Sequence, residues 1–517
     1  MAGILKEYVI TLKNKEDLDQ FYIDMESNNY KVKCIPKRGV VCSNRRNMSR
    51  STHYLLTETE AATLRNDERV LSVELTIEEQ GIEFTPQFIQ DGTSTWAKNS
   101  QQNNTHKNWA LLRMVRGDKI QNWGSNGAPL QSGKIVVAKE GRGVDLILVD
   151  GHTNPDHPEF KTNSDGTGQS RIVNFNWLQY NSIMQSPIAS GNYVYPPYTG
   201  TENNHGAHVF GTLAGNTNGW ARSARLLHMS PYSTNPNVGF SSVLWDYIRT
   251  FHSVKQINPE TGIKNPTVTN HSYGTFLLKA GAPYPLQELA DAITEISFRG
   301  QTLLPPFTTQ TLINCGIVPI SGNAANGVSI PIRVPSIDAD VEDAIIDGVI
   351  VVGAAGNSSF KIDVVGGIDY DNSFVLNGTR RFYHRGSSPT SATGAICVGA
   401  ISSLVDERKA SYSNCGPRVD VYAPGDLIIS SANEQVINSV QDNRDASFYQ
   451  QKLSGTSMAS PQVCGIIATV LETYPSLNQA GVLEYLTTRG SKENQILDST
   501  DSFNNLISLQ GSSNKYA

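Results

Sequence analysis

Ser457 lies in the segment LSGTSMASPQVCG, residues 453–465, where small residues surround a single hydroxyl group. An apolar run of helical length, residues 466–471, follows directly. This layout predicts a serine at the start of a buried helix, on a turn that other groups can approach closely. A serine hydroxyl is a weak nucleophile until a base removes its proton, so the segment indicates chemistry only if partners exist elsewhere in the chain.

Three other segments offer such partners. Asp150 follows the apolar run at residues 146–149, and functional groups gather at the carboxyl ends of strands in open α/β sheets. His205 opens HGAHVFGT, where Gly206 permits close approach, and Asn357 ends VIVVGAAGN, where its side-chain amide can donate a hydrogen bond. Each also has an ordinary interpretation, as a turn residue for the aspartate and asparagine or as a satisfied polar side chain for the histidine.

Together, these four segments resemble the subtilisin-like serine protease family. The stretch GTSMASP repeats the family's nucleophile segment without change. HGAHVFGT departs from the family's HGTHVAGT at Ala207 and Phe210, and the sequence DGH at 150–152 replaces the usual Asp-Thr/Ser-Gly. GAAGN and the stretch ASYSNCGPRVDVYAPG, residues 410–425, also match the family's pattern.

The resemblance implies a serine endopeptidase that hydrolyses peptide bonds through an acyl-enzyme intermediate. Ser457 would be the nucleophile, His205 the general base, and Asp150 the carboxylate that orients and stabilises the imidazole. The side chain of Asn357 and the backbone N–H of Ser457 would form the oxyanion hole.

Substrate-binding residues also follow from the resemblance. Ser272, Tyr273 and Gly274 would line one wall of the S1 pocket, and Ala354-Ala355-Gly356 the other. An extended polypeptide substrate would add as a strand along this edge, and residues 239–241 align loosely with the opposite edge.

Two other functions are compatible with the sequence. One is a structural protein that keeps an inert subtilisin-like scaffold, against which the intact set of four side chains argues. The other is a metal-dependent hydrolase using His205 and His208, although H-x-x-H without a nearby third ligand is a weak zinc pattern.

A metal is not expected at the site, and no cofactor is expected to be required. The stretch AGNTNGWARSARLL, residues 214–227, is short and lacks the longer loop that binds calcium in some family members. Structural calcium is therefore not indicated there, while other calcium sites stay open.

The secondary structure that must position these residues is predicted to be that of an α/β domain. Apolar runs at 146–149, 224–227, 267–270 and 349–352 predict buried parallel strands. They alternate with helix candidates at 239–256, 284–298 and 340–346. We therefore expect a subtilisin-like, doubly wound, mostly parallel sheet flanked by helices.

Residues 1–81 are expected to form a small α+β ferredoxin-like domain that precedes the sheet. Strand and helix patterns follow one another in the order β-α-β-β-α-β, with a strand at 30–34 and a capping box formed by Thr57 and Glu60. By resemblance, this unit is an inhibitory propeptide, an intramolecular partner that plugs the cleft until self-cleavage. An unrelated ferredoxin-like binding module is the alternative.

The remaining boundaries follow from changes in composition. We predict that residues 82–107 form a linker that contains the processing site. Residues 108–490 are then expected to form the catalytic domain, and residues 491–517 a polar tail. An insertion at about 278–338 lengthens the spacing between Ser272 and Asn357 beyond that usual in the family.

Composition limits the partners and the compartment. The formal charge of the 517-residue chain is −6, no Lys/Arg block occurs, and no apolar run reaches the length of a membrane span, so nucleic acid and membrane partners are not expected. The start lacks the order of a secretory signal, and the six cysteines form no CxxC pair. We therefore expect mostly reduced cysteines and a cytoplasmic or virus-associated protein.

Overall fold

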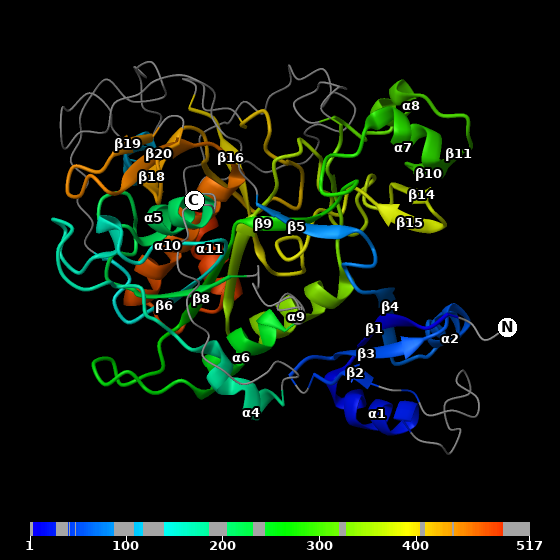
Figure 1. Ribbon diagram of the computed structural model, residues 1–517, viewed down its shortest axis with the longest axis horizontal. Helices are drawn as coiled ribbons and strands as arrows, with labels where there is room; N and C mark the ends of the chain where they lie inside the picture. Colours follow the sequence, from blue (N-terminus) through cyan, green and yellow to red (C-terminus); the bar gives the residue numbers. More distant parts are fainter. Residues whose placement is uncertain are drawn as a thin grey trace.

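A six-stranded parallel sheet with the order β17-β16-β13-β8-β6-β7 forms the centre of the molecule (Figure 1). Its strands are β6 (Asp145–Val149), β7 (Arg225–Met229), β8 (Thr267–His271), β13 (Ile350–Ala354), β16 (Ile396–Ile401) and β17 (Val421–Pro424). This computed structural model describes residues 4–26, 40, 42–46, 48–86, 108–116, 139–185, 204–230, 243–319, 327–403, 409–436 and 439–489. The four predicted strands are all present, and the predicted α/β fold is confirmed.

Both faces of the sheet are buried. Within β6, Leu146 and Leu148 belong to one hydrophobic core, whereas Ile147 and Val149 belong to the other. Successive side chains of a strand point to opposite faces, so a continuous apolar run fits a sheet that is covered on both sides. This is why the strand runs show no polar alternation.

Helices cover the two faces. On one side lie α5 (His205–Ala214) and α10 (Thr456–Thr473), which pack on each other and, with α11 (Gln479–Arg489) and α3 (Trp109–Arg116), contribute to one core. On the other side lie α6 (Leu244–Val254) and α9 (Pro335–Ile346), with the short α4 (Asn181–Met184) beside α6. The helix predicted over 239–256 is therefore shorter, and the one predicted over 340–346 begins five residues earlier, at a proline that suits the first turn.

The N-terminal unit, residues 4–86 as far as described, has a core of its own. Its elements are β1 (Lys6–Leu12), α1 (Leu18–Glu26), β2 (Cys42–Asn44), β3 (Ser51–Leu56), α2 (Glu58–Leu64) and β4 (Val70–Leu75). They form an antiparallel sheet of order β2-β3-β1-β4, as in ferredoxin-like folds, and the capping box of Thr57 and Glu60 is present. The strand predicted at 30–34 lies outside the described residues.

The predicted linker begins with a strand. Residues of β5 (Ile82–Pro86) pair antiparallel with β9 (Tyr273–Leu277), which follows β8. On its other side β9 pairs with β12 (Ile330–Pro331), so β9 is the middle strand of a three-stranded sheet. The end of the N-terminal unit is thus joined by backbone hydrogen bonds to the main unit, which comprises the described residues from 108 to 489.

The predicted insertion has secondary structure of its own. It contains α7 (Leu286–Ala292), β10 (Ile293–Phe298), β11 (Gln301–Leu303) and α8 (Thr309–Asn314). With β14 (Ser373–Leu376) and β15 (Thr379–Phe382), its strands form the sheet β11-β10-β14-β15. The helix predicted over 284–298 is wrong in its second half, because β-branched residues from Ile293 onward pair with β14 instead.

A further small sheet lies against α5. Its strands are β18 (Ile428–Ala432), β19 (Ser439–Gln441) and β20 (Tyr449–Leu453), in the order β18-β20-β19. None of the five cysteines within the described ranges forms a disulfide bond. No helix in the described part of the chain is both long enough and apolar enough to cross a bilayer. The tail at 491–517 and residues 239–241 lie outside the described residues.

Candidate active site

Asp150 and His205 are in direct contact. Oδ1 of Asp150 lies 2.7 Å from Nδ1 of His205, and both side chains are almost completely buried. Asp150 follows the last residue of β6, while His205 is the first residue of α5. Because the same Oδ1 also accepts the backbone N–H of Gly151 at 2.7 Å, the carboxylate is held in one orientation toward the ring.

Gly206 makes this contact geometrically feasible. A Cβ atom at position 206 would lie 2.3 Å from the carbonyl oxygen of Gly151, a distance that real contacts do not reach. The glycine predicted to permit close approach therefore lets the first turn of α5 lie directly on the turn after β6.

His228 supports the same turn from β7 and was missed by the sequence analysis. Its Nε2 lies 2.7 Å from the carbonyl oxygen of Gly151 and 3.2 Å from that of Asp150. Burial lowers the pKa of His228 to about 4, so the ring is neutral and its Nε2–H donates to these carbonyls at pH 7. The sequence feature that could have identified His228 is a histidine within an otherwise apolar strand.

Ser457 lies in the first turn of α10, directly after β20 and a two-residue connection. Its hydroxyl donates to the carbonyl oxygen of Ser272 at 2.8 Å, and the hydroxyl of Ser272 donates to the carbonyl oxygen of Ser457 at 3.0 Å. The predicted nucleophile and the predicted substrate wall are thus joined by two reciprocal hydrogen bonds.

Pro461 lies inside α10 and not in its first turn. Since proline has no N–H, it cannot bond the carbonyl four residues earlier, which is that of Ser457. This carbonyl instead accepts the hydroxyl of Ser272. The proline therefore leaves the Ser457 carbonyl oxygen without its usual partner in the helix. This oxygen can then accept the hydrogen bond that joins α10 to the bend between β8 and β9.

Asn357 lies beside the start of α10. Its Oδ1 accepts the backbone N–H of Thr456 at 2.9 Å and the Thr456 hydroxyl at 2.8 Å. These two donors fix the amide oxygen toward Thr456, so the NH₂ group is the end that points the other way. Thr456, which the sequence analysis did not single out, also accepts the backbone N–H of Gly356 at 3.1 Å.

The predicted substrate-binding residues meet at the same edge of the sheet. Ser272 precedes β9, which begins with Tyr273 and Gly274, while Ala354 ends β13 and leads into Ala355 and Gly356. Gly274 is paired with residue 85 and Tyr273 with residue 86, so the strand β5 already occupies the edge where a substrate strand was predicted.

His208 contacts backbone carbonyl oxygens. Its Nε2 lies 3.0 and 3.1 Å from the carbonyl oxygens of Ile428 and Gln451, and burial lowers the pKa of His208 to about 3. The ring therefore links α5 to β18 and β20. Within the ranges that the structure describes, no group of three or more His, Cys, Asp or Glu side chains could hold a metal ion.

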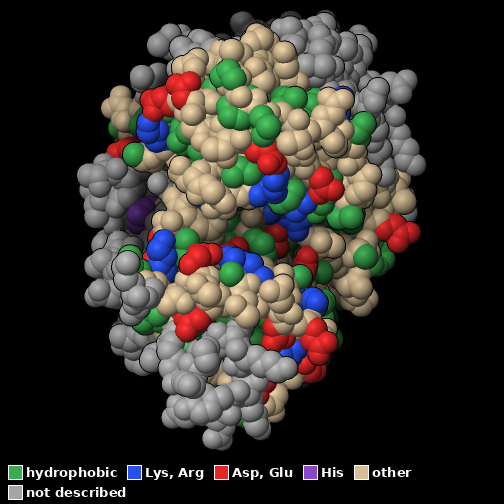
Figure 2. Space-filling model, turned by 90° about the vertical axis from the view of Figure 1, so that its right-hand side faces the viewer, with side chains coloured by type: hydrophobic (Ala, Val, Ile, Leu, Met, Phe, Trp, Pro, Cys, Tyr) green, Lys and Arg blue, Asp and Glu red, His purple; other side chains and the backbone are tan. Residues whose placement is uncertain are grey.

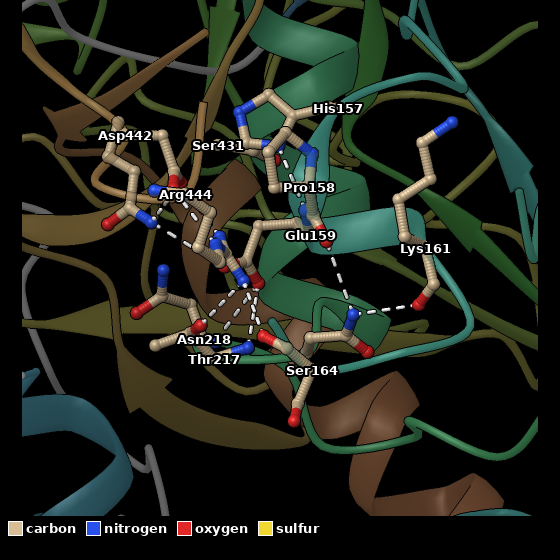
Figure 3. A network of polar contacts seen from close by, with 12 residues as sticks. His157, Pro158, Glu159, Lys161, Ser164, Thr217, Asn218, Ser431, Asp442 and Arg444 are labelled. Atoms are coloured by element: carbon tan, nitrogen blue, oxygen red, sulfur yellow. Dashed lines mark hydrogen bonds and ion pairs between the residues drawn. The ribbon is translucent and has the colours of Figure 1, made fainter. Parts of the chain in front are cut away.

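A buried charge cluster connects the segments that carry the site (Figure 3). Oε1 of Glu159 accepts from the guanidinium of Arg444 at 2.5 Å, and Oε2 accepts the backbone N–H of Thr217 at 2.8 Å. Arg444 also bonds Asp442 at 2.7 Å, and both carboxylate side chains have no solvent exposure. Burial raises the pKa of Glu159, but Arg444 and the backbone N–H outweigh it, so that the pKa is lowered overall.

This cluster therefore joins the segment after β6, the turn after α5 and the connection between β19 and β20. The first carries Asp150, the second follows the helix of His205, and the third leads through β20 to Ser457. An imidazole bonded to a buried carboxylate can accept and return a proton, and a serine at a helix start can attack a carbonyl carbon. The arrangement contains the groups needed for acyl transfer.

Comparison with known proteins gives the family. The sequence model described as the Subtilase family matches residues 141–505. The chain belongs to this family. The match spans the central sheet, the helices from α4 to α11 and all four predicted site segments.

Curated relatives are similar over different lengths. "Subtilisin-like protease 3" of Arthroderma otae is 44% identical over 96 residues, covering 19% of this chain and 20% of the relative. "Subtilisin-like protease 8" of Trichophyton verrucosum is 25% identical over 398 residues, covering 75% of this chain and 56% of the relative. The chain therefore spans about a fifth of the first relatives it matches and about half of the other.

Solved structures include similar folds at low identity. A cold-adapted subtilisin-like serine proteinase has 20% identity and a TM-score of 0.43, with 79% of this chain and 96% of that chain covered. Fervidolysin from Fervidobacterium pennivorans, a keratinolytic enzyme related to subtilisin, has 14% identity and a TM-score of 0.48, with coverage of 94% and 57%.

Substitution of Gly206 tests the close approach of α5 to the turn after β6. Gly206→Ala should lower the free energy of unfolding by about 1–3 kcal/mol, because the added methyl group must displace the carbonyl of Gly151. Chemical denaturation measures this loss. Gly151→Ala is the matched control, since a Cβ there meets no atom within 4 Å; equal stability of the two variants would contradict the packing argument.

Proposed function

We propose that this chain is a serine endopeptidase in which Asp150, His205 and Ser457 act as a catalytic triad. The 2.7 Å contact between Oδ1 of Asp150 and Nδ1 of His205 is the observation that carries this proposal. The buried carboxylate fixes the tautomer that leaves Nε2 of the ring as the base and stabilises the imidazolium formed during reaction. Family membership supports peptidase chemistry for the same residues.

The reaction would begin with rotation of the Ser457 hydroxyl from the carbonyl of Ser272 toward His205. Oγ attacks the carbonyl carbon of the peptide bond while Nε2 of His205 takes the hydroxyl proton. The tetrahedral intermediate then expels the amine, which receives that proton, and leaves an acyl-enzyme. Water attacks the ester, His205 again takes and returns a proton, and Ser457 is restored.

The oxyanion that forms in both steps requires donors. The NH₂ group of Asn357 and the backbone N–H of Ser457 are suited to this role, because the amide oxygen of Asn357 is held by Thr456. The N-terminus of α10 adds a smaller favourable interaction with the negative charge. Each interaction acts only as charge develops, which is what lowers the barrier.

A serine-directed probe tests this function directly. Fluorophosphonate should label the unchanged chain, and Ser457→Ala should abolish labelling because the reacting oxygen is removed. Ser476→Ala, an exposed serine beyond α10, is the matched control and should be labelled normally. Labelling that survives in Ser457→Ala would mean that another residue is the nucleophile. Chelator-sensitive hydrolysis without any labelling would favour the metal-dependent alternative.

We also propose that the N-terminal unit is an inhibitory propeptide removed by self-cleavage. The pairing of β5 with β9 supports this, since it fills the substrate edge with five residues of the same chain. Residue 86 is opposite Tyr273, so a chain continuing in the same direction would bring residue 87 opposite Ser272, to which Ser457 is bonded.

The first cut is therefore expected at the bond after Gln87. Intact mass measurement during a time course should show a product beginning at Phe88, while Ser457→Ala should keep all 517 residues. Normal processing of Ser457→Ala would show that another protease cuts the chain. A first product that begins near residue 108 would contradict the proposed register.

No calcium is proposed at the turn after α5. The carboxylate of Glu159 is already bonded by Arg444 and the backbone N–H of Thr217, so the residues present do not fit a cation there. The guanidinium supplies the positive charge that two buried carboxylates require.

Chelation should accordingly leave the thermal midpoint of the protein unchanged. Arg444→Ala should destabilise it by about 3–5 kcal/mol, because Glu159 and Asp442 lose their shared cation. Thermal and chemical unfolding with and without EDTA measure both effects. A fall in the midpoint with EDTA in the unchanged chain would indicate a cation site elsewhere, whereas an unchanged stability of Arg444→Ala would contradict the role proposed for the guanidinium at this turn.

A further inference from the structure

The loop after β13, residues 355–360, carries Asn357 and is held by one buried residue from a distant segment. That residue is Asn414, which lies between β16 and β17 and has no solvent exposure. Charged side chains are prominent on the surface, as along the hollow on the face shown in Figure 2. The side chain of Asn414 instead contacts uncharged backbone groups inside the fold.

Asn414 uses both ends of its side-chain amide on this loop. Its Oδ1 accepts the backbone N–H of Phe360 at 2.8 Å and that of Ser358 at 3.2 Å. Its Nδ2 donates to the carbonyl oxygen of Ala355 at 2.8 Å. The opposite orientation of the amide would lose all three hydrogen bonds. A single side chain therefore brackets Asn357 from both sides.

The backbone of Asn414 completes the bracket. Its N–H donates to the carbonyl oxygen of Gly356 at 2.8 Å. Gly356 has a φ of +105°, a conformation that favours glycine, so the chain turns sharply directly before Asn357. Backbone groups at such a turn have no partners in a strand or helix, and Asn414 supplies them.

The segment around Asn414 is itself fixed to the central sheet. The hydroxyl of Ser413 accepts the backbone N–H of Ala400 in β16 at 3.0 Å and donates to the carbonyl oxygen of Asn414 at 2.9 Å. The backbone N–H of Cys415 donates to the carbonyl oxygen of Phe360 at 3.0 Å. Because β13 and β16 are neighbours in the sheet, the bracket joins the loop to the adjacent strand.

The bracket determines where the side chain of Asn357 begins. Thr456 holds the amide oxygen at the tip of that side chain, but the backbone from which the side chain extends is set by the loop. An oxyanion donor must lie about 2.7–3.1 Å from the atom on which the charge develops. A displacement of about 1 Å can lower a rate by about 100-fold. A loop that could shift would therefore weaken the donor.

We propose that Asn414 is a positioning residue for the oxyanion hole, acting through the backbone on both sides of Asn357. The inference rests on the proposed function, which assigns Asn357 as an oxyanion donor. Asn414 acts through Asn357 and not on the oxyanion itself. Its contribution to the rate therefore exists only while the Asn357 amide is present.

Fluorophosphonate labelling of the full chain measures this contribution without a known substrate. Oγ of Ser457 forms a bond to phosphorus, fluoride leaves, and His205 takes the hydroxyl proton, while the phosphoryl oxygen gains negative charge in the oxyanion hole. The dependence of the labelling rate on probe concentration separates the maximal rate, kinact, from the half-saturating concentration, KI. Intact mass distinguishes the uncut chain from a self-cleaved product, so one species is compared for all variants.

The decisive measurement is a double-mutant cycle. Asn414→Ala should lower kinact by at least about 10-fold with KI unchanged, because the donor is displaced while the remainder of the site is kept. Asn357→Ala should lower kinact further, because it removes the donor. In the Asn357→Ala background, Asn414→Ala should change kinact by less than about 2-fold, since no amide is left to position.

Asn265→Ala is the matched control. Asn265 also bonds through both ends of its amide, donating to Asp145 at 2.9 Å and accepting from Asn258 at 2.9 Å. Asp145 begins β6, so these contacts lie at the end of the sheet opposite the site. Asn265→Ala should leave kinact unchanged even where it lowers the free energy of unfolding.

A second variant keeps the test decisive if Asn414→Ala does not fold. Asn414→Asp keeps the acceptor for the N–H groups of Ser358 and Phe360 and loses only the donor to Ala355. It should give a smaller fall in kinact, which should again be absent in the Asn357→Ala background.

Two results would overturn the positioning role. One is an unchanged kinact in folded Asn414→Ala, and the other is a loss that is equally large in the Asn357→Ala background. Both are measured on a chain that is labelled at Ser457. Absence of labelling in the unchanged chain would instead refute the proposed function, and the positioning role with it, so the two failures are distinguishable.

Discussion

Parallel pairing of β6, β8 and β13 is the constraint on which the site depends. Because the three strands run in one direction, their carboxyl ends lie at one edge, which brings together Asp150, Ser272 and Asn357 from distant parts of the sequence. The starts of α5 and α10 then add His205 and Ser457 at this edge. Polar groups meet there only because the sheet between them is apolar on both faces.

Residues outside the four site segments make polar contacts that fix this edge of the central sheet. His228 bonds the turn after β6, and Glu159 with Arg444 joins three segments through one buried charge cluster. These groups lie outside the proposed triad, but they fix the backbone that carries it. Positioning of this kind is needed because an error of about 1 Å at a reacting atom can cost two orders of magnitude in rate.

Much of the fold was predictable because its signals are local. Apolar runs gave the strands, and the motif around Ser457 gave the family; the capping box of Thr57 and Glu60 was also correct. The start of a buried helix at Ser457 was also correct, and the helix continues through Pro461, although a proline is better suited to a first turn. The buried ion pair between Arg46 and Asp246 could not be foreseen, since the two residues are 200 positions apart and charged residues in sequence usually indicate a solvated surface.

The missing N–H of Pro461 has an effect on how the site moves. Since the Ser457 carbonyl bonds the Ser272 hydroxyl while the Ser457 hydroxyl bonds the Ser272 carbonyl, the head of α10 and the bend before β9 form a single body. A displacement of this rim on entry of a polypeptide would therefore carry the Ser457 hydroxyl, the proposed nucleophile, with it. The spacing between that hydroxyl and a bound backbone would then be preserved by these two hydrogen bonds rather than by rigidity of the whole domain.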